Sequence, residues 1–189
     1  MLKEPPDAVG NFIHLRYLNL VKYSKDRLHE TICYLCNLQS LKITINSDRF
    51  KELPEGMGKL IKLRHFILDS KFGLNVKFPK GFGRLISLRT ISHFNISGGC
   101  KLEELKNFNH LQWTLQINGL GGTENAYEAE NAQLKKKIGL LTLVSRFNKW
   151  NDEDRGRRND ALILNALEPP LDLEYLHIDD YLAITMFPN

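Results

Sequence analysis

A tandem repeat in the middle of the chain constrains the fold more than any other feature. Residues 53–68, LPEGMGKLIKLRHFIL, are followed by a second copy, FPKGFGRLISLRTI, at residues 78–91. The copies agree at equivalent positions 25 residues apart, among them Pro54 and Pro79, and Arg64 and Arg89. A fixed period of this length is typical of solenoids, in which each unit packs only against its neighbours.

The core of the repeat is a leucine followed three and five residues later by apolar residues. This motif begins at Leu15, Leu38, Leu63, Leu88, Leu140 and Leu173, with a variant carrying one extra residue at Leu111. The spacing is 23 to 25 residues up to Leu111 and then lengthens to 29 and 33. Alternate side chains of a strand share a face, so these residues should line one interior. The pattern predicts an α/β leucine-rich-repeat solenoid, with one curved parallel sheet on the concave face and short helices and turns on the convex face.

Several repeats depart from the pattern. Pro5 stands where a leucine is expected and His29 where a proline is expected, while His93 and Ser145 occupy apolar strand positions. Asn46 alone takes the place of the asparagine that bonds the turn backbone in a standard repeat. We therefore expect local distortion and an irregular horseshoe.

The second half of the chain contains features outside the basic repeat. Residues 124–137 predict a helix on the convex side, with Thr123 as N-cap and Lys135, Lys136 and Lys137 as its solvated end. Residues 148–160 are charged and predict a mobile loop, and residues 161–167 predict a short helix. The first residues resemble the tail of a repeat, so we expect one domain, residues 1–189, that begins in mid-repeat as a fragment.

Motifs for catalysis or cofactors are weak. The run Gly56-Met57-Gly58-Lys59 resembles part of a phosphate-binding loop, but it lacks the upstream glycine and the following serine or threonine. Its recurrence at residues 81–84 is typical of turn glycines. The histidines are scattered, and no hydrolase or metalloprotease motif is present. The sequence predicts a protein that is not an enzyme, with no catalytic, cofactor-binding or metal-binding residues.

Cys33 and Cys36 form a C-x-x-C pair that leaves an alternative open, a thiol or metal redox protein. No second cysteine or histidine pair follows at zinc-site spacing, and the two cysteines lie within a repeat, not in a strand that leads into a redox-active helix. We favour buried or half-buried thiols in a reducing compartment.

The net charge of +4 is mild, and the basic residues are spread through the turns, which argues against a nucleic-acid partner. The longest apolar runs are too short for a membrane span, and the amino terminus has no apolar signal core. The sequence predicts a soluble cytoplasmic protein.

Beyond the leucine spacing, an ordered set of segments resembles one family. HLRYLNL, LHETICYLCNLQSLKI, ELPEGMGKLIKLRHF, FPKGFGRLISLRTISHF and KLEELKNFNHLQWTLQINGL are similar to successive repeats of plant intracellular disease-resistance receptors. EAENAQLKKKIGLLTL, ALEPPLDLEYLHIDDY and a final Phe187-Pro188 continue the resemblance. These receptors have coiled-coil, nucleotide-binding and leucine-rich-repeat regions, and the resemblance covers nearly the whole chain.

The resemblance implies a region that recognises pathogen effectors or modified host proteins and restrains the nucleotide-binding domain of its parent chain. The expected binding residues lie between the inward leucines, on the concave face. They are Arg16, Tyr17, Asn19, Gln39, Lys42, Arg64, His65, Arg89, Trp113, Gln116, Glu174, Tyr175 and His177, with Ser40, Ile67, Thr90 and Ser92 beside them. A free-standing leucine-rich-repeat scaffold or adaptor in signalling remains the main alternative.

Overall fold

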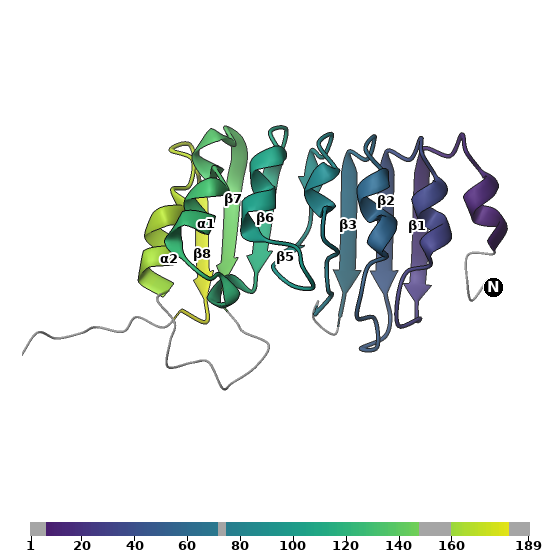
Figure 1. Cartoon of the computed structure of the whole chain (residues 1–189), viewed down its shortest axis with the longest axis horizontal. Helices are drawn as coiled ribbons and strands as arrows, with labels where there is room; N and C mark the ends of the chain where they lie inside the picture. The colour runs from purple at the N-terminus through teal and green to yellow at the C-terminus, as the bar shows by residue number, and fades with distance from the viewer. Residues whose placement is uncertain (1–6, 72–74, 148–159, 182–189) are drawn as a thin grey trace, which may run out of the picture.

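The computed structural model describes residues 7–71, 75–147 and 160–181. In this part of the chain, strands and short helices alternate along one axis, with the strands side by side (Figure 1). The strands are β1 (Tyr17–Tyr23), β2 (Ser40–Ile45), β3 (His65–Ser70), β4 (Thr90–Ile91), β5 (Phe94–Asn95), β6 (Gln112–Asn118), β7 (Gly139–Arg146) and β8 (Tyr175–Asp179).

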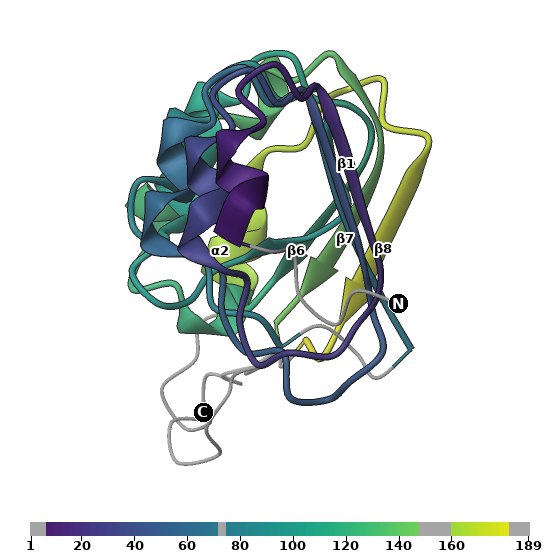
Figure 2. The ribbon, with the colours of Figure 1, turned by 90° about the vertical axis from the view of Figure 1, so that its right-hand side faces the viewer.

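Short 3-10 helices cover the other side of the core. They are η1 (Asp7–Asn11), η2 (Glu30–Tyr34), η3 (Glu55–Lys59), η4 (Phe82–Arg84), η5 (Leu102–Asn107), η6 (Leu120–Gly122) and η7 (Leu134–Lys136). Two α-helices, α1 (Ala126–Asn131) and α2 (Asp160–Leu167), join them. Viewed along the array, helices stack on one side and strands on the other, around a common core (Figure 2). This arrangement confirms the predicted α/β solenoid.

The register of the strands confirms that the repeated apolar residues share one interior. Leu18 pairs with Leu41, which pairs with Phe66, and Phe66 pairs with Ile91. Leu41, Phe66 and Ile91 are at most 1% exposed. Leu18, on the first strand, is only partly buried because just one neighbouring strand covers it.

The glycines of the repeated turn let the 3-10 helices approach one another. A Cβ on Gly58 would lie 2.6 Å from the carbonyl oxygen of Gly81, and Gly81 itself has a φ of +80°. Gly83 packs as closely against Glu104, whose carboxylate accepts hydrogen bonds from the backbone N–H groups of Gly81 and Gly83. These residues pack and cap the turns, as the repetition of the motif predicted.

The strands form two four-stranded sheets, β1-β2-β3-β4 and β5-β6-β7-β8, and the prediction of one sheet was wrong in this respect. The break between the sheets falls at Ser92 and His93, and His93 occupies a strand position where the repeat has an apolar residue. The Ser92 hydroxyl bonds both the N–H and the carbonyl of Leu68, at 2.9 and 3.0 Å, and so replaces a rung of the ladder. At the starts of the strands the array stays continuous, because Gln112 N–H donates to the Arg89 carbonyl at 2.8 Å.

Five phenylalanine rings fill the core on both sides of this break. Adjacent rings meet edge-on or tilted, with centroids 4.7 to 6.4 Å apart. They are Phe66, Phe78, Phe82, Phe94 and Phe108, and all are fully buried. Aromatic packing of this kind adds stabilisation beyond that of area burial alone. The phenylalanine cluster therefore couples the two sheets where the backbone ladder is interrupted.

The helix predicted over residues 124–137 is shorter than expected. α1 covers six residues and starts from Asn125, whose side chain accepts a hydrogen bond from Glu128 N–H, so Thr123 is not the N-cap. The chain then turns at Gln133, with a φ of +52°, into η7. α2 begins at Asp160, one residue before the predicted start. Of the loop predicted over residues 148–160, residues 148–159 lie outside the described residues, as does the Phe187-Pro188 turn, and Asp160 belongs to α2.

The lysine run after α1 is not uniformly solvated. Lys135 and Lys136 are exposed, but Lys137 is 1% exposed and its amine donates to the Phe108 carbonyl at 3.2 Å. Burial lowers the pKa of Lys137 to about 8. The prediction of a solvated helix end therefore fails at its last lysine.

Candidate functional site

The strand side chains that point away from the core form an open surface, which we call the sheet face. All thirteen predicted binding residues are exposed or half-buried. On the first sheet, Tyr17, Ser40, His65 and Thr90 are paired in register across the four strands. Asn19 pairs with Lys42 in the next row. The repeat thus brings residues far apart in sequence into continuous rows.

A second row precedes the strands and forms the rim of the first sheet. Gln39 N–H donates to the Arg16 carbonyl, Arg64 N–H to the Gln39 carbonyl, and Arg89 N–H to the Arg64 carbonyl, at 2.7 to 2.8 Å. Gln112 continues the row. We call Arg16, Arg64 and Arg89 the arginine row; all three side chains are exposed.

The remaining predicted residues belong to the second sheet. Tyr175 and His177 stack on β8 with their rings 6.5 Å apart and nearly parallel. Trp113 is 62% exposed and has a φ of +70°, at a shift in the register between β6 and β7. Such a backbone is uncommon for a bulky residue and is costly. The irregularity falls in the repeat whose motif carries one extra residue.

Three predicted or neighbouring polar residues are already engaged in the fold. Gln116 donates to the Asn118 side chain at 2.8 Å, and Ser92 bonds the β3 backbone. His65 Nδ1 lies 3.2 Å from the Thr90 hydroxyl. These three side chains are less available to a partner than their positions in the sequence implied.

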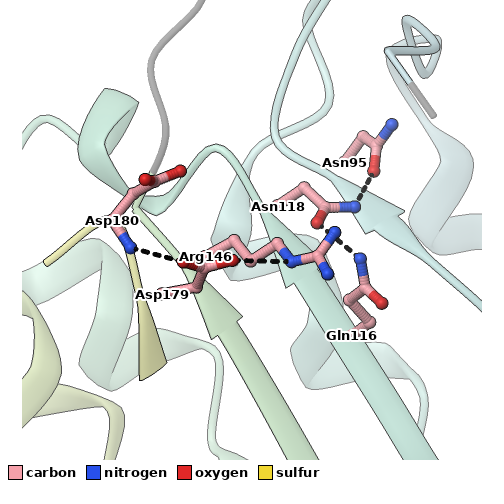
Figure 3. Close-up of polar contacts among 6 residues, drawn as sticks. All are labelled: Asn95, Gln116, Asn118, Arg146, Asp179 and Asp180. Carbon is pink, nitrogen blue, oxygen red and sulfur yellow. Dashed lines mark hydrogen bonds and ion pairs between the residues drawn. The ribbon is translucent and has the colours of Figure 1, made fainter. Parts of the chain in front are cut away.

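A row of polar side chains crosses the second sheet and was missed in the sequence (Figure 3). Asn95, Asn118, Arg146 and Asp179 are paired in register on β5 to β8. The Asn118 amide donates to the Asn95 side chain at 2.6 Å, and the Asn95 amide donates to the Val76 carbonyl at 2.9 Å. The two asparagines lie 23 residues apart, which is the repeat spacing, and this was the signal in the sequence.

The two ends of this polar row differ in environment. Asn95 and Asn118 are buried, whereas the side chains of Arg146 and Asp179 are 41% and 46% exposed. Arg146 Nε lies 3.4 Å from Asp179 Oδ2, close enough for an ion pair although the geometry is too poor for a hydrogen bond. The polar row therefore has buried amides at one end and a solvent-accessible ion pair at the other.

His93 lies at the break between the sheets. Burial and the positive charge of Arg146 lower its pKa to about 4, with Asp69 opposing the shift. Its Nδ1 atom is buried and has no hydrogen-bond partner among the residues that the structure describes. The imidazole is therefore neutral at physiological pH and serves as a packing group.

A shallow groove of about 320 Å³ lies where the chain returns from the strands to the 3-10 helices. Its lining includes Arg27, Glu52 and Lys77, which are joined by parallel backbone bridges. Arg27 and Glu52 lie 3.8 Å apart as an exposed ion pair. Opposite charges thus alternate along this edge and compensate one another.

The two residues of the C-x-x-C pair lie in different environments. Cys33 is buried, Cys36 is exposed, and both are free thiols. Burial raises the pKa of Cys33 to about 12, which disfavours the reactive thiolate. The described ranges contain no group of three or more His, Cys, Asp or Glu side chains placed to hold a metal ion. None of the helices in the same ranges has the length and apolarity of a membrane span.

Comparisons with known proteins agree with this architecture. Residues 4–189 match a family model described as a leucine-rich repeat region. A leucine-rich-repeat protein of Leptospira interrogans has the same fold, with a TM-score of 0.55 at 18% identity over 93% of this chain and 40% of that one.

The curated relatives are plant disease resistance proteins. The chain is 35% identical to a putative disease resistance protein of Arabidopsis thaliana, over 93% of this chain and 13% of the relative. It is 34% identical to the putative disease resistance protein RGA1 of Solanum bulbocastanum, over 98% of this chain and 18% of the relative. The chain thus spans less than a fifth of either protein. It belongs to the leucine-rich-repeat family, and the relatives that it matches are plant disease resistance proteins.

Proposed function

We propose that this chain is the protein-recognition region of a plant immune receptor and acts in the cytoplasm as one domain without enzymatic activity. Its sheet face would recognise a pathogen effector or a modified host protein. The same region would restrain the nucleotide-binding domain of the parent chain until recognition occurs. The likeness to plant disease resistance proteins over more than nine-tenths of the chain supports this role.

The observation that carries the proposal is the exposure of large side chains on the sheet face. Tyr17, Trp113 and Tyr175 are 59%, 62% and 55% exposed, although they belong to strands or their bulges. Aromatic side chains are enriched among the residues that contribute most to protein binding. The core does not include these rings, so their apolar surface is available for contact with a partner.

Proximity labelling in leaf cells tests the proposal. The full chain, fused to a biotin ligase, is compared with the variant Y17A/W113A/Y175A and with the control Y34A/Y127A. The control removes rings that are 56% and 70% exposed on the helical side. We expect proteins that are labelled by the wild type and the control to be lost with the sheet-face variant. An unchanged set of labelled proteins in all three would contradict recognition through this face.

A further inference from the structure

The turns that lead from the short helices into the strands lie along one edge of the array, at the top of Figure 1. In six of the seven repeats, the residue two positions before the leading leucine is apolar. All six side chains are exposed, and we call them the apolar ridge: Ile13, Cys36, Ile61, Ile86, Ile138 and Leu171. Single exposed apolar residues are common on proteins, but a contiguous row of them is typical of an interaction surface.

The backbone turns the ridge side chains outward. Leu60 has a φ of −80° and a ψ of 52°, and Leu85 has a φ of −76° and a ψ of 54°, which is the geometry of an inverse γ-turn. The N–H of the next residue, Ile61 or Ile86, donates to the carbonyl two residues back at 2.9 Å. Both leucines are fully buried, whereas Ile61 and Ile86 are 50% and 57% exposed. Each turn therefore directs one apolar side chain into the core and the following one into solvent.

The ridge is long, narrow and fixed in its spacing. The Asn37 side-chain amide donates to the Ile13 carbonyl at 2.7 Å, and the Lys62 amine donates to the Asn37 side-chain oxygen at 2.7 Å, so side chains tie neighbouring turns together. Neighbouring strands are about 4.8 Å apart, and the seven repeats therefore extend the ridge over about 30 Å. A straight line of aliphatic groups, one side chain wide, suits contact with a flat apolar boundary.

Basic side chains flank the middle of the ridge. Four of them lie within two residues of a ridge isoleucine, and all are exposed: Lys59, Lys62, Arg84 and Lys136. In the described ranges, none of the four forms an ion pair. Within two residues of the ridge, the single acidic residue is Asp172, at the last repeat. The centre of the ridge thus combines aliphatic side chains with uncompensated positive charge.

We propose that the apolar ridge docks on the surface of an anionic phospholipid membrane. Its aliphatic side chains enter the boundary between headgroups and acyl chains, while the flanking lysines and arginine contact lipid phosphates. Contact with the ridge of a second copy would bring like charges together, whereas anionic lipid supplies the opposite charge. Docking through this edge leaves the sheet face open, so it goes beyond the recognition proposed above and does not depend on it.

The test is co-sedimentation of the full chain with vesicles of phosphatidylcholine and phosphatidylserine at a ratio of about 7:3, and with vesicles of phosphatidylcholine alone. I61S/I86S/I138S removes the centre of the ridge. Its matched control, V21S/Y127S/L162S, removes as many exposed apolar side chains elsewhere. K59E/K62E/R84E reverses the flanking charge, and K51E/K80E/K101E makes the same change at exposed lysines away from the ridge. Circular dichroism and urea unfolding verify that each variant is folded.

We expect the ridge variant and the flanking-charge variant each to lose at least about tenfold in partitioning onto the anionic vesicles, and both controls to stay within about twofold. The wild type should bind phosphatidylcholine alone at least about tenfold more weakly. Equal losses in a variant and its matched control would overturn the proposal. So would a ridge variant that binds as well as the wild type, or a wild type that binds both kinds of vesicle equally.

Asn109 provides a variant that should gain binding. It takes the ridge position in the one repeat where that position is polar, and its side chain is exposed. Asn109→Ile completes the ridge and should tighten binding to the anionic vesicles by about threefold or more. The control, Asn165→Ile, makes the same exchange at an exposed site on α2 and should leave binding unchanged. Because a folding defect does not produce a gain, Asn109→Ile variants that bind no more tightly than the wild type would contradict the proposal.

Two further measurements distinguish the other occupants of the ridge. Sedimentation velocity over a range of protein concentrations detects self-association; a dimer that I61S/I86S/I138S abolishes would assign the ridge to a second copy. The labelling experiment in leaf cells, repeated with this variant, detects a protein partner. Loss of labelled proteins without loss of vesicle binding would assign the ridge to that partner, and either outcome would overturn membrane docking while leaving recognition by the sheet face intact.

Discussion

The buried amine of Lys137 makes a quantitative prediction about stability. Burial lowers its pKa from 10.5 to about 8, so the folded protein binds fewer protons than the unfolded chain between these values. Stability therefore rises with pH through this window. At about 1.4 kcal/mol per pH unit, the charged amine costs the fold about 3 kcal/mol at neutral pH. About 2 kcal/mol of that cost disappears between pH 7 and 9.5.

Urea unfolding of the wild type and Lys137→Met between pH 7 and 9.5 measures this effect. Methionine keeps the apolar stem but leaves the Phe108 carbonyl without its donor, a loss of about 1 to 3 kcal/mol that does not vary with pH. The decisive quantity is consequently the change with pH, not the difference at one pH. We expect the stability of the variant relative to the wild type to fall by about 2 kcal/mol across this range.

Lys136→Met is the matched control, because Lys136 is exposed in the same run. Its stability curve should run parallel to that of the wild type. If the Lys137→Met curve is equally parallel, the amine is not held in a low-dielectric interior and the reasoning is refuted.

Three further predictions concern the core. The pKa of His93 is lowered from 6.5 to about 4, so the wild type loses stability as pH falls through this window. His93→Gln should reduce the loss of stability between pH 7 and 4.5 by about 1 to 2 kcal/mol, and urea midpoints at both pH values test this. Asn118→Leu should destabilise the fold by about 1 to 3 kcal/mol in urea unfolding, because it removes the hydrogen bonds that Asn118 makes with Asn95 and Gln116, and a loss near zero would contradict the amide network. Gly58→Ala should lower the thermal midpoint, since the added methyl would lie 2.6 Å from a backbone oxygen, whereas Gly122→Ala, with nothing within 4 Å, should change it little.

The repeated motif was enough to predict the architecture. Leucine spacing predicted which side chains face inward, and the register of Leu18, Leu41 and Phe66 confirms it. The turn glycines were also read correctly. These features are local and recur, so each repeat provides an independent check of the same pattern.

Features that depend on contacts between repeats were harder to predict. Helix propensity favoured residues 124–137, but the short α1 ends where Gln133 turns the chain toward β7. Lys137 looked solvated because its run is charged, yet packing against the preceding repeat buries its stem. The paired amides of Asn95 and Asn118 depend on a register that a single repeat does not reveal.

Within the candidate site, the sequence predicted where the residues lie better than it predicted whether their side chains are free to contact a partner. All thirteen predicted residues lie outside the core, and their binding of a partner stays a prediction. The alternation of strand residues did not show that the Gln116 side chain is held by a hydrogen bond to the Asn118 side chain, two residues further along β6. Contacts of this kind depend on how the side chains are placed in the folded strand, which the alternation of residues does not specify.

The joint between the two sheets has a thermal consequence. Within each sheet, neighbouring repeats are joined by a continuous strand ladder, whereas at this joint the ladder is interrupted and the five phenylalanine rings, packed edge-on or tilted, couple the two sheets. Apolar association weakens on cooling. In an array whose units contact only their neighbours, the interface whose stability falls most steeply on cooling is expected to separate first. We therefore expect cooling to weaken this joint before it weakens either sheet.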